Sequence, residues 1–440
     1  MHLQGTMVIN ERGRLVIGGC EVVQLARDFG TPLYIFDEDC IRENCRRFYQ
    51  AFNAGSGRAE VIYAGKAFLT TAMCRIIASE GLGLDVVSGG ELYTALAAGF
   101  PVDRIYFHGN NKSYAELCQA LAAGVGRFMV DNFAELELLS RLSVERGQVA
   151  KVILRVTPGI EAHTHEYIRT GQIDSKFGFT LPNGQALAAA RRADELPGIE
   201  FKGLHCHIGS QIFELEPYSE AATVMMELAA AVKEATGLVT AELDLGGGFG
   251  IYYSAGDEPR PVSAWAAAIL TRVEAEARRL NLPQPRVLVE PGRAIVGPAG
   301  STAYTVGSIK EIPGVRKYVA VDGGMADNIR PALYGAKYEA ILANKANLPP
   351  AERVAITGKC CESGDMLIWE AELPRIESGD ILLISCTGAY GYTMASNYNR
   401  LGRPAAVLVR DGVADLIIKR EDYSDLIRND VLPARLVRTC

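Results

Sequence analysis

The sequence predicts an α/β protein, a (β/α)8 TIM-type barrel with a second, mainly β-strand domain. Eight short runs of apolar and β-branched residues lie between about residues 60 and 290, and helical patterns alternate with them. Polar or glycine residues stand at the end of each run. Beyond residue 293 the helical patterns become sparse, and short strands separated by turns replace them. The alternating strands and helices predict the barrel, and the strand-rich remainder predicts the second domain.

The eight runs are the predicted barrel strands. Their bounds are 61–65, 84–87, 104–107, 127–130, 151–156, 201–206, 242–245 and 286–289. Intervening stretches such as "SAWAAAILTRVEAEARRLNL" place apolar residues at i, i+3, i+4 and i+7, which is helix spacing. Because an open doubly wound sheet shows the same alternation, closure of the barrel is inferred from the count of eight.

The β domain is predicted from strand-like segments near both ends of the chain. Segments such as "KYVAVDGG" and "DILLISCTGAYG" have strand composition and end in turns. The first 35 residues, which include "RLVIGG" and "TPLYIFD", are also strand-like and are expected to join this domain. We therefore predict a barrel over 36–293 and a β domain built from 1–35 and 294–440.

Composition narrows the possible partners and location. The net charge is -7, and no Lys/Arg run is long enough to follow a nucleic-acid backbone. No stretch reaches the roughly 20 apolar residues that span a bilayer, and the first residues lack the pattern of a signal peptide. The ten cysteines form no CxxC pair, as expected of reduced thiols. These features predict a cytoplasmic protein that binds neither nucleic acid nor membrane.

The residues that follow the predicted strands indicate where the chemistry lies, because the active site of this barrel is at the strands' carboxyl ends. In chain order they are Lys66, Ser88, His108 with Gly109, Asp131, Arg155, His207, the three glycines Gly246, Gly247 and Gly248, and Glu290. Polar groups are therefore expected to converge on one rim.

Lys66 is the candidate nucleophile. In "VIYAGKAF" it follows the first strand among apolar neighbours, which favour a neutral amine able to attack a carbonyl. A plain surface lysine in a loop would fit this stretch equally well.

A phosphate cradle is predicted after the seventh and eighth strands. "LDLGGGFGIYY" offers backbone N–H groups in a glycine-rich turn, and "VLVEPGRAIV" places Arg293 three residues after Glu290. The glycines alone would fit a tight turn. Phosphate sites recur at this place in the barrel, so the glycines and the arginine together are more specific than either.

The stretch "GLHCHIGSQ" places His205 and His207 on one face of the sixth strand. Three interpretations remain open: a zinc site, a pair of core histidines, and a platform for a flat cofactor. Zinc would need further ligands, which His163 and His165 in "EAHTHEYI" could supply, but it leaves the glycines and the arginine unexplained. We favour a core position for His205 and a stacking role for His207.

An amine nucleophile, a phosphate cradle and a carboxylate at one rim describe a pyridoxal phosphate site. Lys66 would form the Schiff base, the glycines would hold the phosphate, and Glu290 would pair with the pyridine nitrogen. Ser210 and the turn after His207 would also reach the phosphate.

Ten ordered motifs carry a family resemblance over nearly the whole chain. They are "YAGKA", "DVVSGGEL", "HTHEYIRTG", "SKFGF", "HCHIGSQ", "DLGGGFG", "EPGR", "RPALYGA", "CCESGD" and "GAYGYTMASNYN". This chain resembles the diaminopimelate decarboxylase family of fold-type III pyridoxal-phosphate enzymes, relatives of ornithine decarboxylase and alanine racemase. The resemblance implies a homodimer with shared active sites, each completed by the partner's β domain.

The resemblance also implies residue roles. Lys66, His207 and Cys361 would be catalytic, as Schiff-base lysine, stacking residue and interfacial proton donor. The cofactor contacts would be Lys66, His207, Ser210, Gly246, Gly247, Gly248, Glu290, Pro291, Gly292, Arg293 and Tyr390. The substrate contacts would be Arg293, Arg330, Tyr334, Glu362 and Tyr390. Small departures, such as Thr157 in "RVTPG" where many members have Asn, and "YGAKYE" in place of "YGAYHE", touch none of these residues.

Two features favour one activity within the superfamily. A carboxylate such as Glu290 keeps the pyridine nitrogen protonated and so favours decarboxylation over racemisation. The second feature is a set of two arginines and a glutamate, Arg330, Arg293 and Glu362. Arginine can bind a distal carboxylate and glutamate a distal ammonium, so this set suits a substrate that carries both better than it suits ornithine, which has only the ammonium. The expected reaction is decarboxylation of meso-2,6-diaminopimelate to L-lysine and CO2, the last step of lysine biosynthesis by the diaminopimelate pathway.

Two other functions remain as alternatives. The first is a relative that acts on another basic amino acid or a tethered derivative. The second is a non-catalytic homologue that binds a protein partner, as antizyme inhibitors do, although Lys66 and the complete phosphate set argue against it.

Overall fold

The computed structural model describes residues 2–160 and 175–436. They fall into two units, one formed by Cys40–Pro298 and the other by residues 1–39 and 299–440. The predicted barrel domain, 36–293, starts four residues before the first unit starts and ends five residues before that unit ends. The difference arises because strand β4 (Leu33–Asp37) lies in the second unit's sheet. At the other end, helix α10 (Arg293–Val296) still belongs to the first unit.

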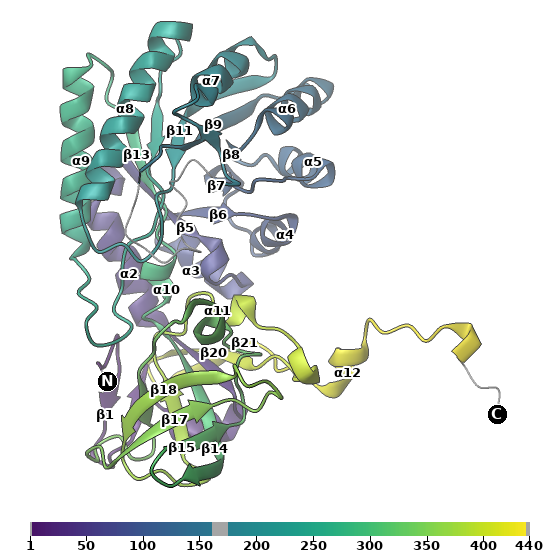
Figure 1. Ribbon diagram of the computed structural model, residues 1–440. Helices are drawn as coiled ribbons and strands as arrows, with labels where there is room; N and C mark the ends of the chain where they lie inside the picture. The colour runs from purple at the N-terminus through teal and green to yellow at the C-terminus, as the bar shows by residue number, and fades with distance from the viewer. Residues whose placement is uncertain (1, 161–174, 437–440) are drawn as a thin grey trace. The chain divides into compact units, whose positions relative to one another are not determined.

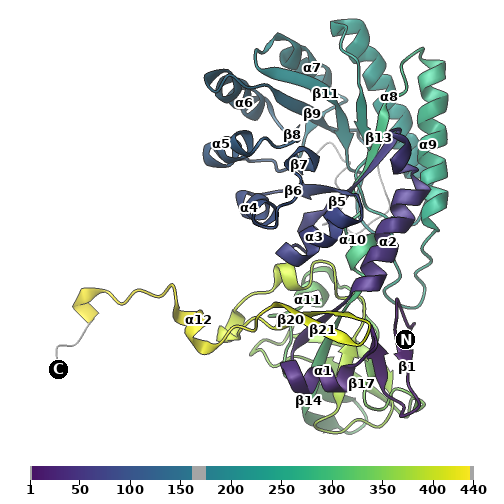
Figure 2. The same cartoon turned by 180° about the vertical axis from the view of Figure 1, so that it is seen from behind.

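The first unit contains a closed barrel of eight parallel strands among the described residues, with helices around it (Figure 1, Figure 2). Neighbouring strands pair in chain order, β13 pairs with β5, and β8 pairs with β9. The strands are β5 (Ala59–Ala64), β6 (Gly83–Val86), β7 (Ile105–Phe107), β8 (Arg127–Val130), β9 (Ala150–Thr157), β11 (Ile199–Cys206), β12 (Glu242–Asp244) and β13 (Arg286–Val289). A two-residue strand, β10 (Phe179–Thr180), adds to β9. The predicted barrel is confirmed.

Side-chain caps begin several of the helices soon after the preceding strand. Ser88 accepts a hydrogen bond from the backbone N–H of Glu91 and so starts α4 only three residues after β6 ends. Ser88 is therefore a capping residue. The helices are α2 (Glu38–Ala51), α3 (Thr71–Ser79), α4 (Gly89–Ala97), α5 (Tyr114–Ala123), α6 (Phe133–Glu145), α7 (Gln185–Glu195), α8 (Glu216–Thr236) and α9 (Val262–Arg279).

The barrel interior is layered. An apolar layer of Ile62, Tyr106, Met129, Ile153 and Leu288 is fully or almost fully buried. Nearer the carboxyl ends of the strands the interior becomes polar, with buried Asp85, His108, His205, Asp244 and Glu290. Because a packed barrel normally fills its centre with branched apolar side chains, a polar layer at this end marks the functional rim.

The second unit is mainly β-sheet. Its main sheet has the order β18-β17-β15-β14-β4-β20-β21. In addition, β19 pairs with β14, and β16 pairs with β19. β4, from the N-terminal segment, pairs with both β14 and β20, so the predicted N-terminal contribution to the β domain is confirmed. The strands after residue 298 are β14 (Gly300–Ile312), β15 (Arg316–Val321), β16 (Ala340–Leu342), β17 (Glu352–Thr357), β18 (Met366–Leu373), β19 (Ile381–Ile384), β20 (Ala405–Arg410) and β21 (Val413–Ile418).

Short elements complete this unit. A three-stranded sheet of β1 (Val8–Ile9), β2 (Leu15–Ile17) and β3 (Cys20–Glu21) leads into α1 (Val22–Phe29). The apolar side chains of β2, β3 and α1 share one core with β4, β14, β19 and β20. Two short helices follow, α11 (Arg330–Tyr334) and α12 (Tyr423–Ile427). In the described part of the chain, no helix combines the length and apolar character needed to cross a bilayer.

Candidate active site

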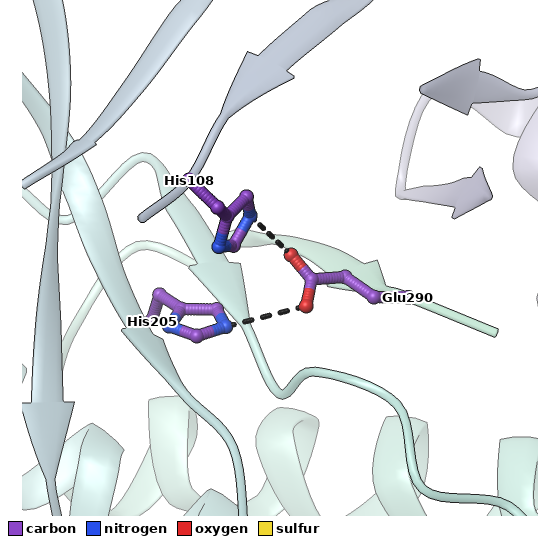
Figure 3. A group of neighbouring side chains, drawn as sticks. All are labelled: His108, His205 and Glu290. Atoms are coloured by element: carbon purple, nitrogen blue, oxygen red, sulfur yellow. Dashed lines mark hydrogen bonds and ion pairs between the residues drawn. The ribbon is translucent and has the colours of Figure 1, made fainter. Parts of the chain in front are cut away.

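Glu290 lies at the centre of the polar layer of the barrel. It follows β13 directly, and its side chain is almost fully buried. One carboxylate oxygen, Oε1, is 2.7 Å from Nε2 of His108, and the other, Oε2, is 3.4 Å from Nε2 of His205 (Figure 3). The two imidazole rings meet edge to face with centroids 5.1 Å apart. Both oxygens of Glu290 therefore face histidine nitrogens.

The surroundings keep Glu290 ionised. Burial alone would raise its pKa, but the contacts with His108 and His205 outweigh burial and hold the pKa well below its usual range. Burial lowers the pKa of His205 to about 4, so this ring is neutral near pH 7. Burial raises the pKa of Asp85 and of Asp244, and the nearby Glu290 charge raises both further. Of these three neighbouring acids, Glu290 is the one whose pKa the surroundings lower.

A zinc site does not fit this geometry. His108, His205 and Glu290 each offer one ligand atom within 4.8 Å of the others. However, two ligands of a tetrahedral zinc lie about 3.3 Å apart, since each is about 2.0–2.1 Å from the metal. The 2.7 Å between His108 Nε2 and Glu290 Oε1 is shorter than that spacing and is the distance of a direct contact between the two side chains. His163 and His165, the additional ligands considered from sequence, lie outside the described residues.

The two histidines of "HCHIGSQ" have different surroundings. His205 is buried, as predicted for a core residue, but its Nε2 faces Glu290. His207 follows β11, and its Nδ1 accepts a hydrogen bond of 3.3 Å from the backbone N–H of Gly247. Desolvation lowers the pKa of His207 well below its usual value, and the charges of Lys66 and Arg155 lower it further. His207 is therefore a neutral ring held in place by the glycine turn.

Ser210 and Arg293 form the polar side of a cradle after β11 and β13. One terminal nitrogen of the buried Arg293 donates to Ser210 Oγ at 2.9 Å. The other donates to Tyr253 Oη at 2.6 Å. The guanidinium is thus fixed on a hydroxyl that can itself donate to an anion.

The three glycines are required by close contacts of neighbouring turns. A Cβ on Gly247 would lie 2.2 Å from the carbonyl oxygen of Glu290, and one on Gly248 would lie 2.3 Å from that of Gly209. Gly246 and Gly248 also have positive φ, +69° and +100°. The backbone N–H groups of Gly246 and Gly247 donate to Asp244 Oδ1 and His207 Nδ1. The serine hydroxyl and the guanidinium at this position in the barrel fit a phosphate group.

Lys66 lies in a short 3-10 turn, Gly65–Ala67, after β5. The apolar neighbours seen in the sequence, Ala67 and Phe68, are buried in the barrel wall, whereas the Lys66 side chain is exposed. Lys66 lies close enough to Asp85 and His207 to affect the pKa of both. The predicted apolar surroundings are wrong because these neighbours turn inward, which leaves the amine among polar groups.

Pro291 and Gly292 connect the Glu290 turn to the Lys66 turn. The backbone N–H of Ala64 donates to Pro291 O at 3.2 Å, and a Cβ on Gly292 would lie 2.9 Å from the Ala64 Cβ. This close packing fixes the positions of Glu290 and Lys66 relative to each other.

A second group of predicted residues lies in the β unit. The buried Arg330 donates through Nε to Tyr338 Oη at 2.9 Å. Its guanidinium is 5.6 Å from the ring centroids of both Tyr334 and Tyr390. These contacts hold an arginine and two tyrosines together.

Cys361 and Glu362 lie on the exposed turn between β17 and β18. The buried Asp365 anchors this turn by accepting hydrogen bonds from the backbone N–H groups of Cys360 and Met325, at 2.8 and 2.6 Å. The N–H of Cys361 donates to Asn399 Oδ1 at 2.7 Å. Cys360 is buried while Cys361 is exposed, so the turn presents one thiol to the surface.

The predicted residues thus form two groups in different units. The barrel unit brings together Lys66, His207, Ser210, Gly246, Gly247, Gly248, Glu290, Pro291, Gly292 and Arg293, and the β unit holds Arg330, Tyr334, Cys361, Glu362 and Tyr390. The sequence analysis assigned no role to Asp85, His108 or Asp244. His108 stands directly after β7, and this position is the same signal that identified Glu290.

Comparison with known proteins identifies the family. A family model described as pyridoxal-dependent decarboxylase, pyridoxal binding domain, matches residues 38–297. The chain is 52% identical over 431 residues to the diaminopimelate decarboxylase of Bacillus subtilis (strain 168), covering 98% of each. It superposes with a TM-score of 0.93 on diaminopimelate decarboxylase from M. jannaschii in complex with L-lysine, at 37% identity over 99% of this chain and 100% of that chain.

A more distant structure shares the fold. The lysine/ornithine decarboxylase from Vibrio vulnificus complexed with putrescine gives a TM-score of 0.76 at 25% identity, over 92% of this chain and 100% of that chain. The family match, the full-length identity and the site geometry agree with the resemblance carried by the motifs. The chain belongs to the diaminopimelate decarboxylase family of pyridoxal-phosphate-dependent decarboxylases.

Proposed function

We propose that this protein is a carboxy-lyase that converts meso-2,6-diaminopimelate to L-lysine and CO2, the last step of lysine biosynthesis by the diaminopimelate pathway. The observation that carries the proposal is a buried carboxylate, Glu290, held ionised beside an amine and a phosphate cradle. When bound, pyridoxal phosphate supplies an electron sink for the pair left behind by CO2. The family's relatives of high identity are diaminopimelate decarboxylases.

The barrel residues would hold the cofactor at three places. Ser210, Arg293 and the glycine turn would bind the phosphate. Glu290 would keep a proton on the pyridine nitrogen, because an ionised carboxylate favours the charged form of a neighbouring base. The neutral ring of His207, fixed by Gly247, would stack on the cofactor ring. Lys66 would supply the amine that binds the cofactor covalently.

The β-unit residues would recognise and protonate the substrate. Arg330, fixed by Tyr338 and flanked by Tyr334 and Tyr390, presents a guanidinium suited to a carboxylate. Glu362 would accept the distal ammonium, and the exposed Cys361 thiol would deliver the proton to the α carbon. Arg293 was also predicted to contact substrate, but its hydrogen bonds to Ser210 and Tyr253 favour the phosphate side.

The reaction itself is the direct test. Purified protein supplied with pyridoxal phosphate and meso-2,6-diaminopimelate is expected to release CO2 and L-lysine in equal amounts, measured by CO2 capture and amino-acid analysis. Ornithine and L-lysine serve as control substrates, because they lack the distal carboxylate that Arg330 would bind. Faster CO2 release from either control would identify a different basic amino acid as substrate. Absence of CO2 from all three, with cofactor bound, would favour a non-catalytic binding role.

We further propose a cytoplasmic homodimer whose β units complete the partner's barrel sites. The exposed position of the Cys361 and Glu362 turn supports this arrangement, because a thiol and a carboxylate there are available to another chain. The C-terminal segment exposes large apolar side chains, among them Tyr423 at 87% and Val431 at 86%, and it lies away from its unit's sheet (Figure 1). The nine described cysteines are free thiols, as expected in a reducing compartment.

Subunit mixing tests the shared site. Lys66→Ala and Cys361→Ala chains, each nearly inactive alone, are expected to regain activity when mixed and allowed to exchange subunits. With equal amounts, about half the dimers are heterodimers with one intact site of two, so activity should approach about a quarter of wild type.

A matched mixture controls for nonspecific rescue. Lys66 and Glu290 lie in the same barrel, so a Lys66→Ala and Glu290→Gln mixture leaves every heterodimer site with one defect. This mixture should stay inactive. If the first mixture also stays inactive while native mass spectrometry shows heterodimers, Cys361 does not act in the partner's site.

A further inference from the structure

Two histidines that received no catalytic, cofactor or substrate role from the sequence contact Glu290. We propose that His108 is a positioning residue, which keeps the Glu290 carboxylate ionised and directed at the cofactor's pyridine nitrogen. The inference rests on the proposed role of Glu290 and extends it to a residue that would act through it.

The contacts cross the barrel. Glu290 follows β13 and His108 follows β7, and the sheet order places β5 and β6 between these two strands. His205 comes from β11, on the other side of β12. The carboxylate is therefore contacted at both oxygens by residues that follow or end two other strands, neither of them adjacent to β13 (Figure 3). Contacts at both oxygens limit rotation of the Glu290 side chain.

The two contacts are unequal. Nε2 of His108 is 2.7 Å from Oε1, whereas Nε2 of His205 is 3.4 Å from Oε2. A nitrogen–oxygen distance of about 2.7–2.9 Å is typical of charge-assisted contacts, and a longer one is weaker. His108 is thus the closer partner. Its contact with Oε1 is an electrostatic one, because neither His108 Nε2 nor Glu290 Oε1 has a hydrogen-bond partner among the described residues, and Oε2 is the oxygen that makes a hydrogen bond, to His205.

Other ionisable groups at this rim explain why a partner is needed. Asp85 from β6 and Asp244 from β12 are both buried, and Asp244 Oδ1 accepts the N–H of Gly246 at 2.8 Å. A carboxylate buried beside two further carboxyl groups would take up a proton unless a nitrogen donor opposed it. Once protonated, Glu290 would no longer stabilise a proton on the pyridine nitrogen.

The test compares His108→Ala with His108→Gln in the cofactor-loaded enzyme. The glutamine amide nitrogen can take the place of Nε2, while alanine leaves no donor. With alanine, kcat is expected to fall about 10-fold to 100-fold, the effect of losing a contact to a charged group, while KM changes little. In pyridoxal phosphate enriched with 15N, the ring-nitrogen NMR shift should move toward the unprotonated value. Glutamine should restore both.

His205→Ala provides the matched control, since it removes the longer contact to the same carboxylate. It is expected to change the 15N shift and kcat less than His108→Ala does. The inference is overturned if the alanine variant keeps the wild-type 15N shift, or if alanine and glutamine are equally impaired, which would indicate a packing role. Glu290→Gln distinguishes a failure of the proposed Glu290 role from a failure of the His108 role. If this variant leaves the 15N shift and kcat unchanged, the role of Glu290 itself is wrong, whatever the His108 variants show.

Discussion

Replacing Lys66 with alanine is expected to lower kcat at least about a thousandfold, because both cofactor attachment and substrate exchange would use this amine. Lys66 lies on the short turn after β5, close enough to Asp85 and His207 to affect the pKa of both. No other described lysine follows a barrel strand directly at this rim. Turnover by steady-state CO2 release is the measurement, with borohydride trapping of the cofactor as an independent reading.

Lys66→Arg is the control for charge. Arginine keeps the positive charge beside Asp85, but its guanidinium does not act as a nucleophile near neutral pH. Both variants should lose turnover and the borohydride-trapped adduct, while their melting temperatures stay near wild type because the side chain is exposed. Wild-type turnover in either variant would remove Lys66 from covalent chemistry.

Most of the barrel could be predicted because its strands carry a local signal. The predicted run 286–289 coincides with β13, and 127–130 coincides with β8, since buried parallel strands are continuous apolar runs ended by polar or glycine residues. Closure required the pairing of β13 with β5, two segments more than two hundred residues apart. Only the count of eight pointed to it.

The site residues that carry a local signal could likewise be predicted, and the contacts between distant strands could not. Glu290 and His207 were predictable because each stands at the end of a strand, where this barrel places its chemistry. The contact of His108 with Glu290 was not predictable, because it joins strands that are not neighbours in the sheet. The exposure of Lys66 was missed for a related reason: apolar neighbours in sequence pack into the wall and leave the lysine outside it.

In the β unit, local sequence carried less information. Cys361 is positioned by Asn399, and its turn is anchored by Asp365 to Met325, all through contacts over long sequence separations. Composition and spacing could not specify these contacts, so the roles of Cys361 and Arg330 were predicted from the family motifs alone.

Glu290→Gln is expected to lower kcat at saturating cofactor at least about a hundredfold while leaving the fold intact. Glutamine has nearly the same shape and can still meet His108 and His205, but it carries no charge to hold a proton on the pyridine nitrogen. The phosphate contacts of Ser210 and Arg293 are untouched, so cofactor affinity should change much less than kcat. Turnover at saturating pyridoxal phosphate and the cofactor's dissociation constant are the two measurements. If affinity falls while the saturated rate holds, Glu290 only binds the cofactor, and the electron-sink role proposed for this carboxylate is wrong.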